Sequence, residues 1–116
     1  MRQTPAQRHR MTAMAAMAAA SSTQNPHGEP TGSAYELTLA QLHAHMRTLK
    51  DIKSVERKIE AKRTMLADFD AYLDGVLLAD AGGQDTVLST VLVWHLDAGN
   101  WTRALELATY AMRHGV

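Results

Sequence analysis

The sequence of 116 residues contains no cysteine, no long apolar run and no surplus of either charge. Without cysteine it cannot build a disulfide scaffold, a thiolate metal site or a cysteine nucleophile, and this composition fits a reducing compartment. No apolar run approaches the roughly 18 residues that a membrane-spanning helix needs, so we expect no membrane partner. A glycine-rich phosphate loop is also missing, which excludes the usual ATPase machinery, and we predict no cofactor.

The charges are distributed unevenly along the chain. Twelve Lys and Arg balance twelve Asp and Glu, and a net charge of zero argues against a partner selected by bulk charge. Ten basic and five acidic residues lie up to Arg63, whereas two basic and seven acidic residues follow it. The chain should therefore present one basic and one acidic surface.

Residues 1–33 predict a flexible basic arm and a linker. The start MRQTPAQRHRMTAMAAMAAASS places arginines before an Ala/Met run, as a signal peptide does. That run contains no Leu, Ile, Val or Phe, so we favour a disordered, weakly helical arm carrying Arg8 and Arg10 over a signal peptide. The stretch SSTQNPHGEPTGSA has almost no apolar content and indicates a linker.

Residues 34–116 predict an all-α domain that begins with a long helix. Ser33 and Glu36 have the spacing of a capping box, which predicts a helix start at this point. From Tyr35 to Leu66 no Gly or Pro occurs and apolar residues recur at helical spacing, which predicts a long helix of roughly 48 Å if it is unbroken. Its apolar stripe turns by about 130° near Lys50. The helix should kink there or change its packing partner.

A compact cluster of three shorter helices should follow the long one. The apolar residues of the first recur at helical spacing from Phe69 to Leu77, and the glycine pair at residues 82–83 stops this helix. Residues 87–96 have strand propensity, but the apolar run is longer than most strands and lies between helical patterns, so we predict a buried helix. The last helix should start after Asn100 and end at Gly115. In the last two helices we expect the core to contain Trp94, His95, Trp101, Ala104, Leu105, Ala108, Ala111 and Met112.

A basic segment between residues 47 and 63 is the clearest functional feature. It carries seven positive charges and three acids, and on one continuous helix Lys50, Lys53 and Arg57 fall within about a 60° arc. Such a row can contact a phosphate backbone. The alternative is a solvated face held by intrahelical charge pairs. The predicted DNA contacts are Arg47, Lys50, Lys53, Arg57, Lys58, Lys62 and Arg63, with Arg8 and Arg10 of the arm.

A group of closely spaced aspartates offers a rival chemistry. A metal-dependent nuclease needs carboxylates that converge on Mg²⁺ to activate water. Asp70 and Asp74 are one helical turn apart, but Asp85 lies beyond the two glycines and no lysine follows Lys62. Favourable interaction of acids with helix starts explains most of these residues. Asp70, Asp74 and Asp85 are therefore weak catalytic candidates. We predict no metal site, and Mg²⁺ is required only if the nuclease alternative holds.

Two segments resemble a known protein family. The stretches GQDTVLSTVLVWHLDAGNW and ALELATYAMRHG place their glycine, aspartate and tryptophan residues as in the small terminase subunit of tailed bacteriophages, the type labelled as the terminase endonuclease subunit. The resemblance extends from Tyr35 to Gly115, and TPAQRHRM looks like the short basic start of those proteins. Members of the family are about twice as long, so the resemblance covers their N-terminal half.

The resemblance implies a part in packaging DNA into preformed capsids within the host bacterial cytoplasm. It further implies double-stranded viral DNA and a large ATPase subunit as partners, and assembly into a homo-oligomer. The nuclease label has the least support from the residues, so enzymatic activity is left open. A third alternative is a helical module that binds only protein and docks a motor or portal through its last hairpin.

Overall fold

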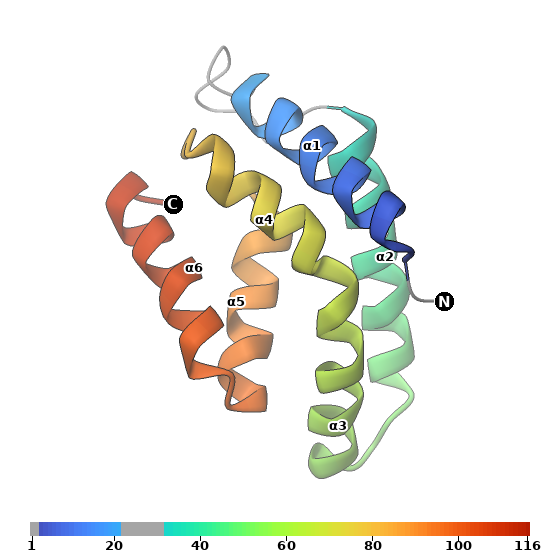
Figure 1. Cartoon of the computed structure of the whole chain (residues 1–116). Coiled ribbons are helices and arrows are strands. Elements are labelled where there is room, and N and C mark those ends of the chain that lie inside the picture. The colour runs from blue at the N-terminus through green and yellow to red at the C-terminus, as the bar shows by residue number, and fades with distance from the viewer. Residues whose placement is uncertain (1–2, 22–31) are drawn as a thin grey trace.

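The computed structural model describes residues 3–21 and 32–116 of the chain. All regular elements of this part are helical, which confirms the predicted all-α class, and no helix in it combines the length and apolarity needed to cross a membrane. Figure 1 shows α1 and α4 side by side across one end of two helical hairpins, α2–α3 and α5–α6. The elements are α1 (Pro5–Ser21), α2 (Ser33–Lys50), α3 (Val55–Leu66), the 3₁₀ turn η2 (Ala67–Phe69), α4 (Asp70–Ala79), α5 (Thr86–Ala98) and α6 (Trp101–His114).

The predicted long helix is two antiparallel helices. Helix α2 ends at Lys50, and α3 begins at Val55 and runs back alongside it (Figure 1). Ser54 caps α3, because its hydroxyl accepts the backbone N–H of Arg57 at 3.3 Å. The prediction of a single long helix is therefore wrong, whereas the predicted discontinuity near Lys50 is confirmed and both halves are helical. The turned apolar stripe gives the reason, since only a reversal lets both stripes face the same core.

The N-terminal arm is also more ordered than predicted. Helix α1 runs along α4, with Ala15 fully buried and the Thr12 hydroxyl donating to the carbonyl of Ala71 at 2.9 Å. The prediction of a disordered arm is therefore wrong for Pro5–Ser21, because small side chains let this helix approach α4 closely. The predicted linker falls mainly on residues 22–31, which lie outside the described residues. The division of the chain at residue 33 stays a prediction.

The helix ends differ in detail from those predicted. Helix α2 does begin at Ser33, but Gly32 occupies the cap position and no side chain caps this end, so the predicted capping box is wrong. Helix α4 ends at Ala79, and the next residue, Asp80, adopts the left-handed conformation with φ of 52°, two residues before the predicted glycine stop. The helical assignment of residues 87–96 is confirmed by α5.

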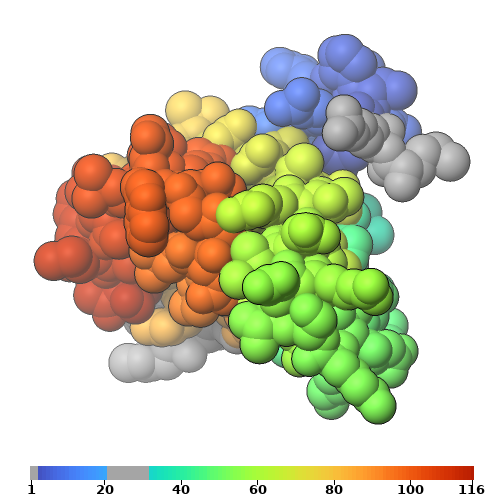
Figure 2. Space-filling model, turned by 90° about the horizontal axis from the view of Figure 1, so that it is seen from below, coloured from blue at the N-terminus to red at the C-terminus, as the bar shows by residue number. Residues whose placement is uncertain are grey.

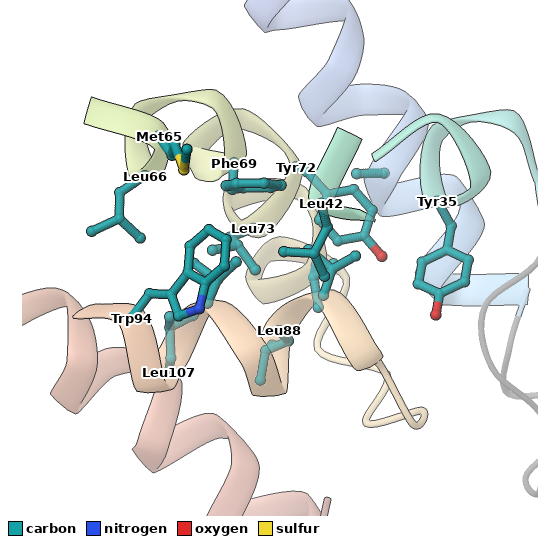
Figure 3. Packing of buried hydrophobic residues seen from close by; sticks show 14 of the residues in the cluster. Tyr35, Leu42, Met65, Leu66, Phe69, Tyr72, Leu73, Leu88, Trp94 and Leu107 are labelled. Atoms are coloured by element: carbon teal, nitrogen blue, oxygen red, sulfur yellow. The ribbon is translucent and has the colours of Figure 1, made fainter. Parts of the chain in front are cut away.

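The core lies where the two hairpins meet α4. Figure 3 shows Phe69 beside Trp94, and their ring centroids are 6.1 Å apart in an edge-on arrangement. Trp94 and His95 are buried as predicted. The His95 Nδ1 atom lies 3.2 Å from the side-chain amide of Asn100, which joins α5 to the start of α6.

The predicted core stripe of α6 is only partly buried. Trp101, Leu105 and Met112 are 66%, 68% and 83% exposed, so the prediction that they lie in the core is wrong. A second apolar face packs against α5 instead, and it gains a hydrogen bond of 2.8 Å from the backbone N–H of Gly82 to the hydroxyl of Tyr110. The buried residues of this face are Ala104, Leu107 and Tyr110.

Candidate nucleic-acid interface

The turn between α2 and α3 forms a basic hairpin tip, which we define as residues 47–58. It joins the C-terminal turn of α2, the connecting residues and the first turn of α3. In Figure 2, which views the molecule from below, the green surface of this end faces the reader. Two acids, Asp51 and Glu56, are outnumbered by five cations. The cations are Arg47, Lys50, Lys53, Arg57 and Lys58, all exposed except Lys58, which is half-buried.

The positive charges of the tip have no acidic partner in the described part of the chain. None of the ion pairs between described residues involves its five cations. Arg47 and Lys50 lie in the last turn of α2, where the helix dipole stabilises positive charge. This interaction does not neutralise the two side chains. The tip therefore presents an excess of three positive charges to solvent.

The two remaining basic residues of the segment are used within the fold. The ammonium group of Lys62 lies 2.8 Å from a carboxylate oxygen of Asp97, and Arg63 Nε donates to the carbonyl of Ala98 at 3.3 Å. Both contacts hold α3 against α5. They leave Lys62 and Arg63 less available to a phosphate backbone than the five cations of the tip.

The basic residues come together in a different way from the one predicted. Lys50 belongs to α2, Lys53 lies in the turn and Arg57 belongs to α3, so they do not line one face of one helix. The chain reversal brings them together instead. Arg8 and Arg10 are exposed on α1, whose start lies beside α2 and apart from the tip (Figure 1).

Asp70 and Asp74 are positioned by an arginine. Arg103 Nη2 donates to Asp74 Oδ1 at 2.7 Å and to the backbone carbonyl of Asp70 at 3.2 Å, which joins α6 to α4. Burial raises the pKa of the Asp70 carboxyl above its ordinary value, while the nearby guanidinium of Arg103 opposes that rise. This arrangement is a charge cluster that connects two helices.

Asp85 has a different place and a structural role. It is 5% exposed, and its carboxylate accepts the Tyr72 hydroxyl at 2.7 Å and the backbone N–H of Leu88 at 3.0 Å. It thereby caps α5 and ties that helix to α4. Across residues 3–21 and 32–116, no group of three or more His, Asp or Glu residues is placed to hold a metal ion. The nuclease alternative stays a prediction without a carboxylate cluster to support it.

Asp85 should contribute strongly to the stability of the fold. Asp85→Ala removes the cap of α5 and leaves the buried Tyr72 hydroxyl without its acceptor, so we expect a loss of about 2–4 kcal/mol in the free energy of unfolding. Urea denaturation followed by circular dichroism measures this loss. Tyr72→Phe is the matched control, because it removes the hydroxyl and keeps the cap, and it should cost roughly half as much. An Asp85→Ala protein as stable as the parent would contradict the capping role.

Sequence reasoning named the five cations of the tip but missed two other residues that shape it. Ser54 supplies the cap of α3 and Val55, which is 71% exposed, adds an apolar side chain among the cations. A local signal was available, because a serine followed by Glu56 in the first turn is typical of a helix start. It was hidden by the continuous helical pattern on both sides.

Comparisons with known proteins agree with the family named by resemblance. The profile of the phage small terminase subunit family matches residues 39–116, which include the whole hairpin tip. The chain is similar to the "Terminase, endonuclease subunit" of Escherichia phage P2, with 42% identity over 114 residues. That alignment covers 97% of this chain and 44% of the relative, so the chain spans less than half of the relative's length. No solved structure matches the chain significantly.

Proposed function

Because the chain belongs to the phage small terminase subunit family, we propose that it binds double-stranded viral DNA through the hairpin tip during genome packaging. The observation that carries this proposal is the group of five cations at the tip, which have no acidic partner among the described residues. Contacts of Lys and Arg with phosphates supply sequence-independent affinity and orient a protein on the duplex.

The family also defines the partners that we propose. The chain delivers the genome to the large terminase subunit, which supplies the ATPase motor, and it assembles with further copies of itself. Both interactions take place in the host bacterial cytoplasm. The fold is compatible with these roles, because α6, which lies on the opposite side of the molecule from α2 (Figure 1), has large exposed apolar side chains.

The salt dependence of DNA binding tests the proposal directly. With three to five phosphate contacts at the tip, the logarithm of the binding constant should fall with the logarithm of salt concentration with a slope of about −3 to −4.5. Affinity should therefore drop roughly 100-fold between 50 and 200 mM salt. Fluorescence anisotropy with a labelled duplex of about 20 base pairs measures both quantities.

Other outcomes separate the alternatives. Binding that does not change with salt would overturn the proposal, and absence of binding combined with capture by the large subunit would favour a module that binds only protein. The name of the phage P2 relative keeps the nuclease alternative testable. Nicking of plasmid DNA in Mg²⁺ or Mn²⁺ by the chain alone, lost in Asp70→Ala, would support that alternative.

A further inference from the structure

Helix α6 carries an apolar seam that no other part of residues 3–21 and 32–116 covers. We call Trp101, Leu105, Ala108 and Met112 the outer seam. Its three large members are 66%, 68% and 83% exposed, although α6 already buries a separate apolar face against α5. Figure 1 shows α6 at the outer edge of the molecule, with its far side open. Contiguous exposed apolar surface of this kind marks a protein interaction site.

The spacing of the outer seam fits a second helix as its occupant. Its members follow one another by four, three and four residues, which is the spacing of the contact positions in paired helices. The seam runs from the first residue of α6 almost to its end. A partner helix laid lengthwise along α6 therefore covers every member.

The order of side chains in the outer seam makes it complementary to itself in one orientation. When two copies pair antiparallel about the middle of α6, Trp101 meets the partner's Met112, and Leu105 meets the partner's Ala108. Each layer then combines a larger with a smaller side chain, and the tryptophan ring contacts a polarizable thioether. Parallel pairing instead stacks Trp101 on its own copy and leaves a gap between the two alanines.

Charge does not oppose this pairing. The residues directly beside the outer seam on α6 are uncharged, and the nearest charged side chains, Glu106 and Arg113, which line a hollow together with Leu105, have opposite signs. The antiparallel arrangement also places opposite ends of the two helix dipoles together. A net charge of zero removes long-range repulsion between copies. The flanking residues are Thr102, Ala104, Thr109 and Ala111.

We propose that α6 forms an antiparallel, two-fold symmetric contact with α6 of a second copy through the outer seam. This inference rests on the self-association proposed above and names its surface. The seam offers roughly 500 Å² of exposed surface per copy, most of it apolar side chain. A pair then buries about 1,000 Å², which is the lower limit for a specific interface, so we expect weak association that depends on protein concentration.

Sedimentation equilibrium of the full chain tests the interface without DNA. We expect a mass of twice 12.7 kDa at high protein concentration. The double variant Leu105→Glu, Met112→Glu should remain at the mass of one chain and weaken association at least 10-fold, because it places acids inside the contact. Leu78→Glu is the matched control, since Leu78 is 73% exposed on α4 outside the seam, and it should associate like the parent. Unchanged circular dichroism verifies that each variant is folded.

Disulfide cross-linking tests the orientation, because the natural chain contains no cysteine. In the antiparallel pair, a mixture of the Trp101→Cys and Met112→Cys variants should form a covalent dimer, whereas each alone should not. The reason is that position 101 of one copy lies about 16 Å along the helix from position 101 of the other copy, and the same holds for position 112. Self-cross-linking of the Trp101→Cys variant alone would overturn the antiparallel contact.

The remaining outcomes separate this inference from the proposed function. Persistent self-association of the Leu105→Glu, Met112→Glu variant would overturn the outer seam as the interface while leaving self-association in place. A parent chain that keeps the mass of one chain at every concentration would overturn both the seam and the proposed self-association. DNA binding by the hairpin tip is measured independently of these masses, so its failure would leave the interface result unaffected.

Discussion

Simultaneous replacement of Arg47, Lys50, Lys53 and Arg57 by alanine is expected to lower the affinity for duplex DNA roughly 100-fold or more in 100 mM salt. Each lost phosphate contact reduces the number of counterions released on binding by about one. The slope of the logarithm of the binding constant against the logarithm of salt concentration should therefore become shallower by about 3 to 4. The loss should be the same for duplexes of different sequence, because phosphate contacts do not read bases. Anisotropy titrations at several salt concentrations measure affinity and slope together.

The fold should survive these substitutions. All four side chains are exposed and none forms an ion pair with another described residue, so the free energy of unfolding should change by about 0.5 kcal/mol or less per site. A thermal melt of the variant that matches that of the parent shows that lost binding is not lost structure. This check separates the tip from Lys62, whose removal also breaks a contact between α3 and α5.

Two further variants test whether position or total charge matters. Asp51→Asn with Glu56→Gln removes the two acids of the tip and should strengthen binding several-fold, because it removes repulsion from phosphates. Arg8→Ala with Arg10→Ala removes two charges from α1 and should weaken binding less than loss of two tip cations. Equal losses at the two places would contradict the assignment of binding to the hairpin tip.

The helical character of residues 35–66 was predictable, whereas their reversal was not. Regular apolar spacing gives each half its helix, and the turned stripe near Lys50 indicated a discontinuity there. The turn itself contains no Gly or Pro, and it is held by Ser54 and by packing of both helices on the same core. Local sequence therefore located the break but did not fix its angle, because the angle depends on contacts with distant residues.

The two largest differences between the predicted and the observed packing, at α1 and at α6, have the same physical origin. Helix α1 is poor in large apolar side chains, and only its partner surface on α4, about 60 residues further along the chain, shows why small residues suffice. Helix α6 carries two apolar faces, and sequence spacing alone does not show which one meets α5. In both cases the choice is made by the shape of a partner that is distant in sequence.

Prediction of the candidate site from sequence is limited in the same way. Four of the five cations at the tip are exposed and Lys58 is half-buried, but the partners of the other basic residues lie far away in sequence. Lys62 meets Asp97 across 35 residues, and Arg103 meets Asp74 across 29. Composition therefore indicated the basic segment, and our proposal narrows its predicted DNA contacts from seven residues to the five of the hairpin tip.

The second large effect is expected at the contact between α1 and α4. A side chain added at Gly75 would bring its Cβ to 2.7 Å from the Cβ of Ala15 and 2.9 Å from the backbone nitrogen of Ala16, and closer still to the carbonyl of Thr12. Backbone atoms of α1 cannot move aside by rotating a side chain, so the whole helix must shift. Gly75→Val should therefore destabilise the chain by about 3 kcal/mol or more. Urea denaturation measures the loss, and faster amide exchange in α1 identifies the helix that moves.

The smaller substitution Gly75→Ala tests the same contact, because helix propensity and steric crowding change the stability of this variant in opposite directions. Alanine favours the interior of a helix over glycine by about 1 kcal/mol. With α1 in place, the crowding should exceed this gain and the variant should be less stable than the parent. A more stable Gly75→Ala protein would show that α1 is not held against α4.

The same contact is testable from the side of α1 with a matched pair of substitutions. Ala15 is fully buried against α4, whereas Ala13 on the same helix is exposed. Ala15→Leu should cost about 1–3 kcal/mol by overpacking, while Ala13→Leu should change stability by about 0.5 kcal/mol or less. Both substitutions have nearly the same effect on helix propensity, so their difference isolates the packing of α1 on α4. If the two variants were equally stable, Pro5–Ser21 would behave as the mobile arm that its composition predicts, and the basic residues of α1 would be positioned independently of the core.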